Sequence, residues 1–207
     1  IRVPSSVTKI DESAFADCGL ESIVIPASVE IIGAYAFQDC GNLKNVILSD
    51  GIMHIKVNAF AGSGIEFVSI PKSVSDIGGG AFSNCSSLKS ISVSYDSSYY
   101  SSIDGVLFNK DKTSLIQYPC GKTGDSYSIP ETTTTIANSA FEGSTTLTNI
   151  IMPDSIVEMG MNTFSKCSNL TNVKLSKNLK TIGRMSFYRC MSLEKIEVPY
   201  GVSSISY

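Results

Sequence analysis

Hydrophobic residues recur along the chain with a period of 22 or 23 residues. A phenylalanine, usually preceded by alanine, marks this period, and successive marker phenylalanines are 22, 23, 22, 59, 23 and 23 residues apart. The markers are Phe15, Phe37, Phe60, Phe82, Phe141, Phe164 and Phe187. A unit of this length cannot bury its apolar side chains alone, so the period predicts units that stack on one another.

The unit that spans residues 20–40 begins with an alternating segment, which predicts a short β-strand. Hydrophobic and polar residues alternate over residues 21–25, so Ile23 and Ile25 should face the interior. Pro26 has no backbone N–H to donate, and we therefore expect it to end the strand.

The second half of the same unit predicts turns that bury an aromatic ring. Val29 and Ile32 form a second apolar pair, and Gly33 allows a turn. Ala36 and Phe37 then start a short helical or irregular turn in which the ring is buried. We predict a repeat solenoid, a right-handed stack of roughly eight or nine coils built mainly from short β-strands. At about 4.8 Å per coil, the stack would be about 40 Å long.

The repeated pattern resembles a known family of leucine-rich repeats. Over residues 20–40 it reads Leu-x-x-Ile-x-Ile-Pro-x-Ser-Val-x-x-Ile-Gly-x-x-Ala-Phe-x-x-Cys, which is similar to the BspA-type leucine-rich repeat. Ordinary leucine-rich repeats carry asparagine in the cysteine slot and lack the Ala-Phe pair. The resemblance covers nearly the whole chain. It implies a right-handed leucine-rich-repeat fold, a cell-surface or secreted location, and adhesion to host extracellular proteins or to other cells.

The long step between two marker phenylalanines indicates an insertion. Phe82 and Phe141 are 59 residues apart, more than two repeat periods. Residues 102–109 and 114–119 are two apolar segments around a polar corner at residues 110–113. Two such segments around a short polar corner predict a β-hairpin. The resemblance agrees, because BspA-type proteins often carry a hairpin between repeats.

The insertion divides the repeats into two groups within one continuous domain. We assign residues 1–94 to N-terminal repeats, 95–130 to the insertion and 131–207 to C-terminal repeats. The insertion is either a structural spacer that extends the sheet or a binding protrusion. The second interpretation rests on three tyrosines, because loop tyrosines supply contact area at a low entropy cost. These secondary candidates are Tyr95, Tyr99 and Tyr100.

Five of the six cysteines occupy one position of the repeat, three residues after the marker phenylalanine. They are Cys18, Cys40, Cys85, Cys167 and Cys190. Side chains in one column run parallel, which fits disulfide geometry poorly, and the chain has no Cys-x-x-Cys spacing for zinc. We expect them to be buried thiols that pack between coils. Cys120 lies outside this pattern and is the one candidate for a free reactive thiol.

Composition narrows the possible functions. Apolar residues make up 43% of the chain, charged residues 17%, and the net charge is −3. These values favour a packed core over disorder and argue against a generic basic nucleic-acid surface. No apolar run approaches about 18 residues, so we expect no membrane insertion by this segment. The one histidine, His54, is expected to be a partly exposed surface residue, and we predict no catalytic residue, cofactor or metal site.

Two outward columns remain on the strands once the inward residues are subtracted. The first column is Ser22, Asn45, Phe67, Ser90, Asn149, Asn172 and Lys195. The second is Val24, Ile47, Ser69, Ser92, Ile151, Lys174 and Glu197. Three apolar members, Val24, Ile47 and Phe67, lie on successive coils and form a candidate hot spot for a protein partner. Alternatively, capping residues outside this segment cover them.

These observations favour a non-enzymatic protein-interaction module that binds through its concave strand face. The candidate contact residues are Val24, Asn45, Ile47, Phe67, Ser69, Asn149, Ile151, Lys174 and Lys195. The resemblance implies an extracellular or cell-surface location and a partner such as a host matrix protein, a plasma protein or another cell surface.

Two other functions stay open beside the interaction module. One is a structural stalk that presents another domain. The other is part of a surface glycan-processing enzyme, which needs two carboxylates about 5–9.5 Å apart. Glu197 is the single acid in the outward columns, so this second alternative finds little support.

Overall fold

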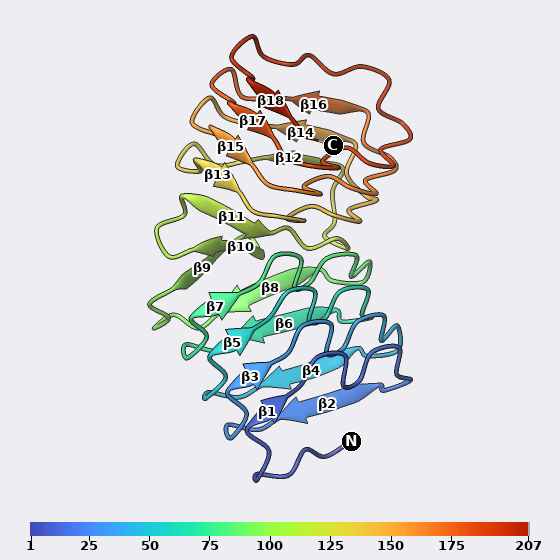
Figure 1. Cartoon of the computed structure of the whole chain (residues 1–207), viewed down its shortest axis with the longest axis vertical. Helices are drawn as coiled ribbons and strands as arrows, with labels where there is room; N and C mark the ends of the chain where they lie inside the picture. The colour runs from blue at the N-terminus through green and yellow to red at the C-terminus, as the bar shows by residue number, and fades with distance from the viewer. Residues whose placement is uncertain (207) are drawn as a thin grey trace.

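The computed structural model describes residues 1–206 and shows a β-solenoid of about nine coils (Figure 1). The chain winds from one end of the elongated stack to the other, and each coil of about 23 residues rests on the one before it. No helix is present in the described residues. The repeat solenoid predicted from the period of the phenylalanines is therefore confirmed.

The first strand of each coil joins a parallel sheet, interrupted once along the stack. In the N-terminal half the sheet order is β2-β4-β6-β8, and in the C-terminal half it is β12-β14-β16. The first group comprises β2 (Ser22–Ile25), β4 (Asn45–Leu48), β6 (Phe67–Ile70) and β8 (Ser90–Val93). The second group comprises β12 (Ser126–Ser128), β14 (Asn149–Ile151) and β16 (Asn172–Lys174).

The second residue of the apolar pair in each coil, such as Ile32, lies in a second, two-residue strand. These strands join two further sheets, β1-β3-β5-β7 and β18-β17-β15-β13-β11-β10-β9. The N-terminal members are β1 (Lys9–Ile10), β3 (Ile31–Ile32), β5 (His54–Ile55) and β7 (Asp76–Ile77). The C-terminal members are β13 (Thr135–Ile136), β15 (Glu158–Met159), β17 (Thr181–Ile182) and β18 (Ser204–Ile205).

Parallel pairing places equivalent residues of successive coils side by side. Ile23 pairs with Val46 and Ile25 with Leu48, and all four side chains are buried. The core of each half is therefore a set of columns that run from coil to coil, as expected for repeats that cover one another.

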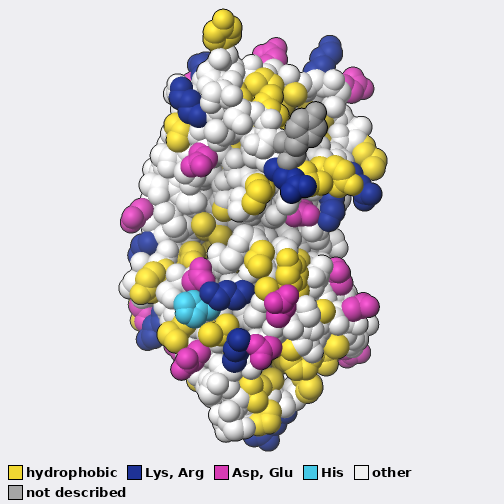
Figure 2. Space-filling view, viewed as in Figure 1, with side chains coloured by type: hydrophobic (Ala, Val, Ile, Leu, Met, Phe, Trp, Pro, Cys, Tyr) yellow, Lys and Arg dark blue, Asp and Glu magenta, His cyan; other side chains and the backbone are white. Residues whose placement is uncertain are grey.

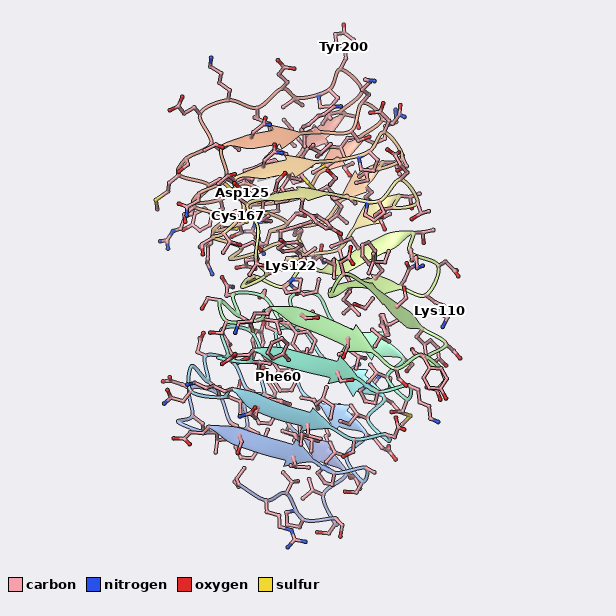
Figure 3. All side chains as sticks on the ribbon, turned by 180° about the vertical axis from the view of Figure 1, so that it is seen from behind. Phe60, Lys110, Lys122, Asp125, Cys167 and Tyr200 are labelled. Carbon is pink, nitrogen blue, oxygen red and sulfur yellow. The ribbon has the colours of Figure 1, made fainter. Side chains whose placement is uncertain are left out.

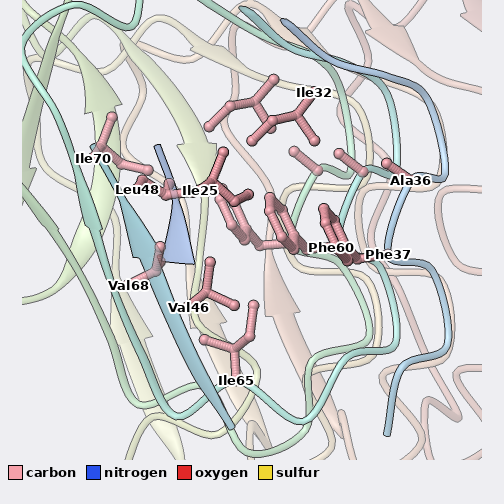
Figure 4. Close-up of a cluster of buried hydrophobic side chains, with 14 of the residues drawn as sticks. Ile25, Ile32, Ala36, Phe37, Val46, Leu48, Phe60, Ile65, Val68 and Ile70 are labelled. Atoms are coloured by element: carbon pink, nitrogen blue, oxygen red, sulfur yellow. The ribbon is translucent and has the colours of Figure 1, made fainter. Parts of the chain in front are cut away.

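The marker phenylalanines form the central column of this core. In the N-terminal half the ring centroids of Phe37 lie 5.2 Å from Phe15 and 5.1 Å from Phe60, with ring planes within 10° of parallel. Figure 4 shows the rings of Phe37 and Phe60 stacked among aliphatic side chains from both rows of strands, such as Ile25 of β2 and Ile32 of β3. Stacked rings at this spacing are favourable beyond the area that they bury.

Two residues with positive φ flank each marker ring, and they explain why the segment is not helical. In the second coil these are Tyr35 (φ 58°) and Asp39 (φ 56°), two residues before and two after Phe37. A left-handed residue cannot continue an α-helix. The chain therefore makes two successive turns around the ring, which is the irregular alternative of the sequence prediction.

The predicted hairpin is confirmed, and a third strand accompanies it. Strands β10 (Val106–Asn109) and β11 (Ser114–Gln117) pair antiparallel around residues 110–113, and β9 (Tyr100–Ile103) pairs antiparallel with the other edge of β10. Strand β11 also pairs parallel with β13 of the next coil. The meander is thus built into the second row of strands.

The insertion also contains a shortened coil that the spacing of phenylalanines concealed. Tyr118 stands in the marker position, and its ring centroid lies 5.1 Å from that of Phe141. Leu107 of β10 packs with the N-terminal core, whereas Val106 and Phe108 pack with the C-terminal core. The insertion therefore joins the two halves through buried side chains.

Replacement of Phe37 by alanine should lower the free energy of unfolding by about 3–5 kcal/mol, because the ring is fully buried between two others. Phe67→Ala is the matched control, because that ring is 59% exposed, and it should cost less than about 1 kcal/mol. Urea unfolding followed by circular dichroism measures both. Equal losses would contradict the assignment of Phe37 to the core column.

Candidate functional site

The strand face, defined as the outward side of β2, β4, β6 and β8 and of β12, β14 and β16, carries the two predicted columns. Ser22 pairs with Asn45 and Asn45 with Phe67, so members of the first column are neighbours on successive strands. Val24 likewise pairs with Ile47 in the second column. The inward residues of β2, β4 and β6 are buried, as the alternation in the sequence predicts, whereas Val93 of β8 and Tyr127 of β12 are only partly buried.

Three large apolar side chains on this face are exposed to solvent. Val24 is 51% exposed, Ile47 58% and Phe67 59%. Val24 and Ile47 are direct cross-strand neighbours, and Phe67 lies diagonally across from Ile47 because it pairs with Asn45. Diagonal neighbours in a sheet are within reach of an aromatic side chain. We call these three residues the apolar patch.

A lysine and a glutamate lie beside the ring of Phe67. The Lys89 ammonium lies 5.5 Å from the centre of the Phe67 ring and 2.8 Å from a carboxylate oxygen of Glu66. The hydrogen bond from Lys89 and its positive charge lower the pKa of the Glu66 carboxyl. A cation over the ring face favours one placement of the side chain. The ring of Phe67 therefore lies beside the ion pair of Lys89 and Glu66.

The strand face of the C-terminal half is polar. The Asn172 side-chain amide donates to Asn149 Oδ1 (2.6 Å), and the Asn149 amide donates to Ser126 Oγ (2.8 Å). Ile151 is 37% exposed, and Lys174 stands exposed beside it on β16. We call the Ser126, Asn149 and Asn172 column the amide ladder, because its polar groups satisfy one another.

The predicted contact residues do not form one continuous surface. Strands β8 and β12 are not paired with each other, because the turn between β9 and β10 lies against β8. In that turn the Gly105 carbonyl accepts from the Ile91 amide (2.9 Å), and Lys122 Nζ donates to the Asp104 carbonyl (2.6 Å; Figure 3). Gly105 has a φ of +80°, and a Cβ there would lie 2.5 Å from Ser90 Oγ, so the turn requires glycine.

The interruption separates the apolar patch, with Asn45 and Ser69, from Asn149, Ile151 and Lys174. Lys195 lies beyond β16 in a segment that is not a strand, and a cavity of about 510 Å³ lies between β16 and residues 195–199. The sequence columns did not signal this interruption, since they were aligned across the insertion.

The insertion tyrosines differ from one another in exposure. Tyr95 is 95% exposed and Tyr99 51%, as a binding protrusion requires, but Tyr100 is buried. The Tyr100 hydroxyl accepts a hydrogen bond from the Ile77 amide (2.9 Å), and burial raises its pKa. Tyr100 was therefore wrongly placed among the exposed candidates, because its hydroxyl secures β9 against the preceding coil.

The cysteines form the predicted column, and four of its five thiols donate a hydrogen bond to the backbone. The thiols of Cys40, Cys85, Cys167 and Cys190 donate to the carbonyl of the marker phenylalanine one coil before, at 2.9–3.1 Å. No disulfide is present among residues 1–206. A hydrogen bond from each thiol to a buried carbonyl gives the repeat a reason to keep a small donor at this position.

The expectation of a reactive Cys120 is wrong. Cys120 is buried, and its thiol donates to the Glu142 carbonyl (3.1 Å), so it occupies the column beside Cys85. Burial raises the pKa of its thiol to about 12. The sequence concealed this because Cys120 follows Tyr118 by two residues, whereas the other cysteines follow their phenylalanine by three.

The remaining chemistry-bearing residues are surface pairs. His54 is partly exposed, as expected, and its Nδ1 lies 3.4 Å from Asp76 Oδ2, which also accepts from Lys56 at 2.8 Å. Basic and acidic side chains are interspersed over the face seen in Figure 2. In the part of the chain that the structure describes, no three His, Cys, Asp or Glu residues are grouped to hold a metal ion, and no helix could span a membrane.

Comparisons with known proteins agree with this architecture. A family model described as the BspA type leucine rich repeat region matches six copies of the repeat over residues 8–127 and 118–207. The comparison with curated proteins found no match.

Two solved structures are similar over nearly the whole chain. The pneumococcal vaccine antigen PcpA is 33% identical with a TM-score of 0.92, over 97% of this chain and 50% of that one. A leucine rich cell surface protein from Faecalibacterium prausnitzii is 33% identical with a TM-score of 0.87, over 96% of this chain and 53% of that one. The chain thus spans about half the length of both structures.

The cysteine column predicts a large difference in thiol reactivity between native and unfolded protein. All six cysteines should react with DTNB in guanidinium without reductant, whereas at most two should react quickly at pH 8 in the native protein. Burial raises the pKa of Cys85 to about 11 and that of Cys120 to about 12, so almost no reactive thiolate is present at that pH. The partly exposed Cys18 should react first, and Cys190 should follow more slowly, because burial raises the pKa of its thiol to about 11.

Mass spectrometry of the labelled native protein identifies the reacting positions. Early labelling of Cys120 would contradict its place in the column. Fewer than six reactive thiols after unfolding would reveal a disulfide.

Proposed function

The chain belongs to the BspA-type leucine-rich repeat family, and from that premise we propose that it is a non-enzymatic binding module that holds a protein partner against its apolar patch. Repeat solenoids present long, regular surfaces, and proteins of this architecture use them for binding. The partner we propose is an extracellular protein, such as a matrix or plasma protein of a host or a protein on another cell.

The observation that carries this proposal is the exposure of Phe67 beside Ile47 and Val24. Burial of a large apolar side chain is worth about 1.5–3 kcal/mol, and this part of the solenoid forgoes that gain at three neighbouring positions. Equivalent outward positions on β8 hold serine, Ser90 and Ser92. The fold itself therefore does not require apolar residues there, and a partner supplies a reason for them.

The proposed extracellular location rests on the solved relatives. One is a vaccine antigen and the other a cell surface protein, by their descriptions, and each is 33% identical to this chain over the aligned half of its length. Adhesion to a host factor is the finer part of the proposal. It is supported by the combination of this family with an exposed aromatic anchor, since such anchors dominate binding energy in protein interfaces.

The Phe67→Asp substitution should weaken binding to the partner at least about tenfold, because it removes the aromatic anchor and adds an unpaired charge to the interface. Surface plasmon resonance against immobilised fibronectin, fibrinogen, laminin and collagen is the measurement. Val157→Asp is a matched control. Val157 is also exposed, it lies outside the strand face, and Glu30 and Lys180 occupy its position in other coils.

Equal affinity of Phe67→Asp and the parent for every captured protein would remove the apolar patch from the binding site. A parent chain that binds none of the four would instead favour a stalk that presents another domain. Retained binding by Val157→Asp, with loss by Phe67→Asp, would place the contact on the strand face.

A further inference from the structure

We propose that residues 94–99, which we call the tyrosine loop, form a second protein-binding surface that is independent of the apolar patch. The loop follows β8 and leads into β9, at the start of the insertion. This proposal extends the proposed function to a second surface of the module. It can be tested separately, because the tyrosine loop shares no residue with the apolar patch.

The composition of the loop suits binding. Its sequence is Ser-Tyr-Asp-Ser-Ser-Tyr, three serines and two tyrosines around a single charge. Binding surfaces made from loops favour these residue types, because tyrosine offers a large rigid contact area with few rotatable bonds and serine offers adaptable hydrogen bonds. Tyr95 and Tyr99 direct 95% and 51% of their surface to solvent.

Hydrogen bonds within the loop hold its backbone in one shape. The Ser97 amide donates to the Ser94 carbonyl (3.0 Å), and Ser97 Oγ accepts from the amides of Tyr99 and Tyr100 (both 3.3 Å). The Ser94 hydroxyl donates to Asp96 Oδ1 (2.5 Å). An ordered loop loses less conformational entropy when it binds, which favours affinity.

Two lysines fasten the loop to the rest of the solenoid. Lys72, one coil earlier, places its ammonium 3.1 Å from Asp96 Oδ2. Lys110, at the end of β10, donates its side chain to the Ser97 carbonyl and its amide to the Tyr99 carbonyl (2.8 Å). Figure 3 shows Lys110 at the outer edge of the insertion. The two exposed tyrosines therefore stand on a support that is fixed at both ends.

Tyr100, the third tyrosine of this segment, has a structural role. Tyr100 is buried, and its hydroxyl bonds to the backbone of β7. A spacer needs only such an anchor, and one tyrosine provides it. Tyr95 donates no side-chain hydrogen bond within the described structure and packs little of its surface, so the fold gains nothing from it.

The charges around the loop indicate the kind of partner surface. The one acid, Asp96, is paired with Lys72, and the Lys110 amine is turned to a backbone carbonyl. The contact area offered by the two tyrosines is uncharged, which fits a groove of weakly charged, polar and aromatic character on a protein. Binding of this kind depends little on ionic strength, because salt screens interactions between exposed charges and the tyrosine rings carry none.

The test compares the parent with Tyr95→Ser/Tyr99→Ser and with Phe67→Asp on immobilised fibronectin, fibrinogen, laminin and collagen. We expect the double variant to lose at least about tenfold in affinity for one or more of these proteins. Phe67→Asp should retain that interaction, and its affinity should change by less than about threefold between 50 and 500 mM salt. Tyr95→Phe/Tyr99→Phe is the matched control for ring area without the hydroxyls, and should keep most of the affinity.

Parent-like binding of the double serine variant to all four proteins, or no binding by the parent, would overturn the proposal. Loss that appears only with Phe67→Asp would do so as well, while leaving the apolar patch in place as the binding site. Binding that disappears after enzymatic deglycosylation of the immobilised protein would also overturn it, since the loop would then recognise a glycan. The thermal melting temperature of each variant should match the parent, because both tyrosines are exposed.

Discussion

The stacking of one aromatic ring on the next is the constraint on which the rest of the solenoid depends. Phe37 touches rings on both sides at 5.1–5.2 Å, and the amide of Phe37 donates to the Ala59 carbonyl of the following coil at 2.7 Å. Ring contact and backbone bond together tolerate no slip between coils. Other features of the repeat support this alignment of each coil on the next. Left-handed residues on both sides fold the chain around the ring, and the thiol of the same coil caps the carbonyl of the ring before it.

The insertion interrupts the aromatic stack after Phe82 and begins a second stack with parts of its own. Tyr118 provides the ring and Cys120 the thiol, while β11 replaces the two-residue strand of a normal coil. This coil is short between strand and ring, so the turns of the coils on either side of it meet directly. Asn84 and Glu142, 58 residues apart, are joined through backbone (3.0 Å) and side chains (3.1 Å), and Lys166 pairs with the same carboxylate (3.1 Å). The two halves are therefore locked together at a buried polar contact as well as through the core.

The sequence predicted the structural features that recur from coil to coil. The strand of residues 21–25, the buried ring of Phe37 and the hairpin strands all follow from alternation and period, and the structure has them. The exceptions arise where spacing changes. Tyr118 and Cys120 were missed because the ring follows Leu115 by three residues, whereas Phe82 follows Ile77 by five. Tyr99 and Tyr100 could not be told apart, because only the position of β9 against β7 decides which ring is buried. The left-handed turns left a usable signal, since Asp17, Asp39 and Asn84 all follow a marker ring by two residues, and Asp and Asn tolerate that conformation.

Because the inner columns are fixed by stacking, the outward positions are where coils are free to differ, and the two halves differ in kind. Across β14 and β16 the outward amide of Asn172 donates to the amide oxygen of Asn149, its partner on the neighbouring strand. That surface satisfies its own polar groups and leaves little for a partner to gain. In the N-terminal half Phe67 occupies the column equivalent to Asn149 and Asn172, and Ile47 lies in the neighbouring column; both are exposed apolar side chains. The tyrosine loop begins directly after β8, the last strand of this group. The apolar patch and the tyrosine loop thus both lie in the N-terminal half, on the same side of the contact between Asn84 and Glu142.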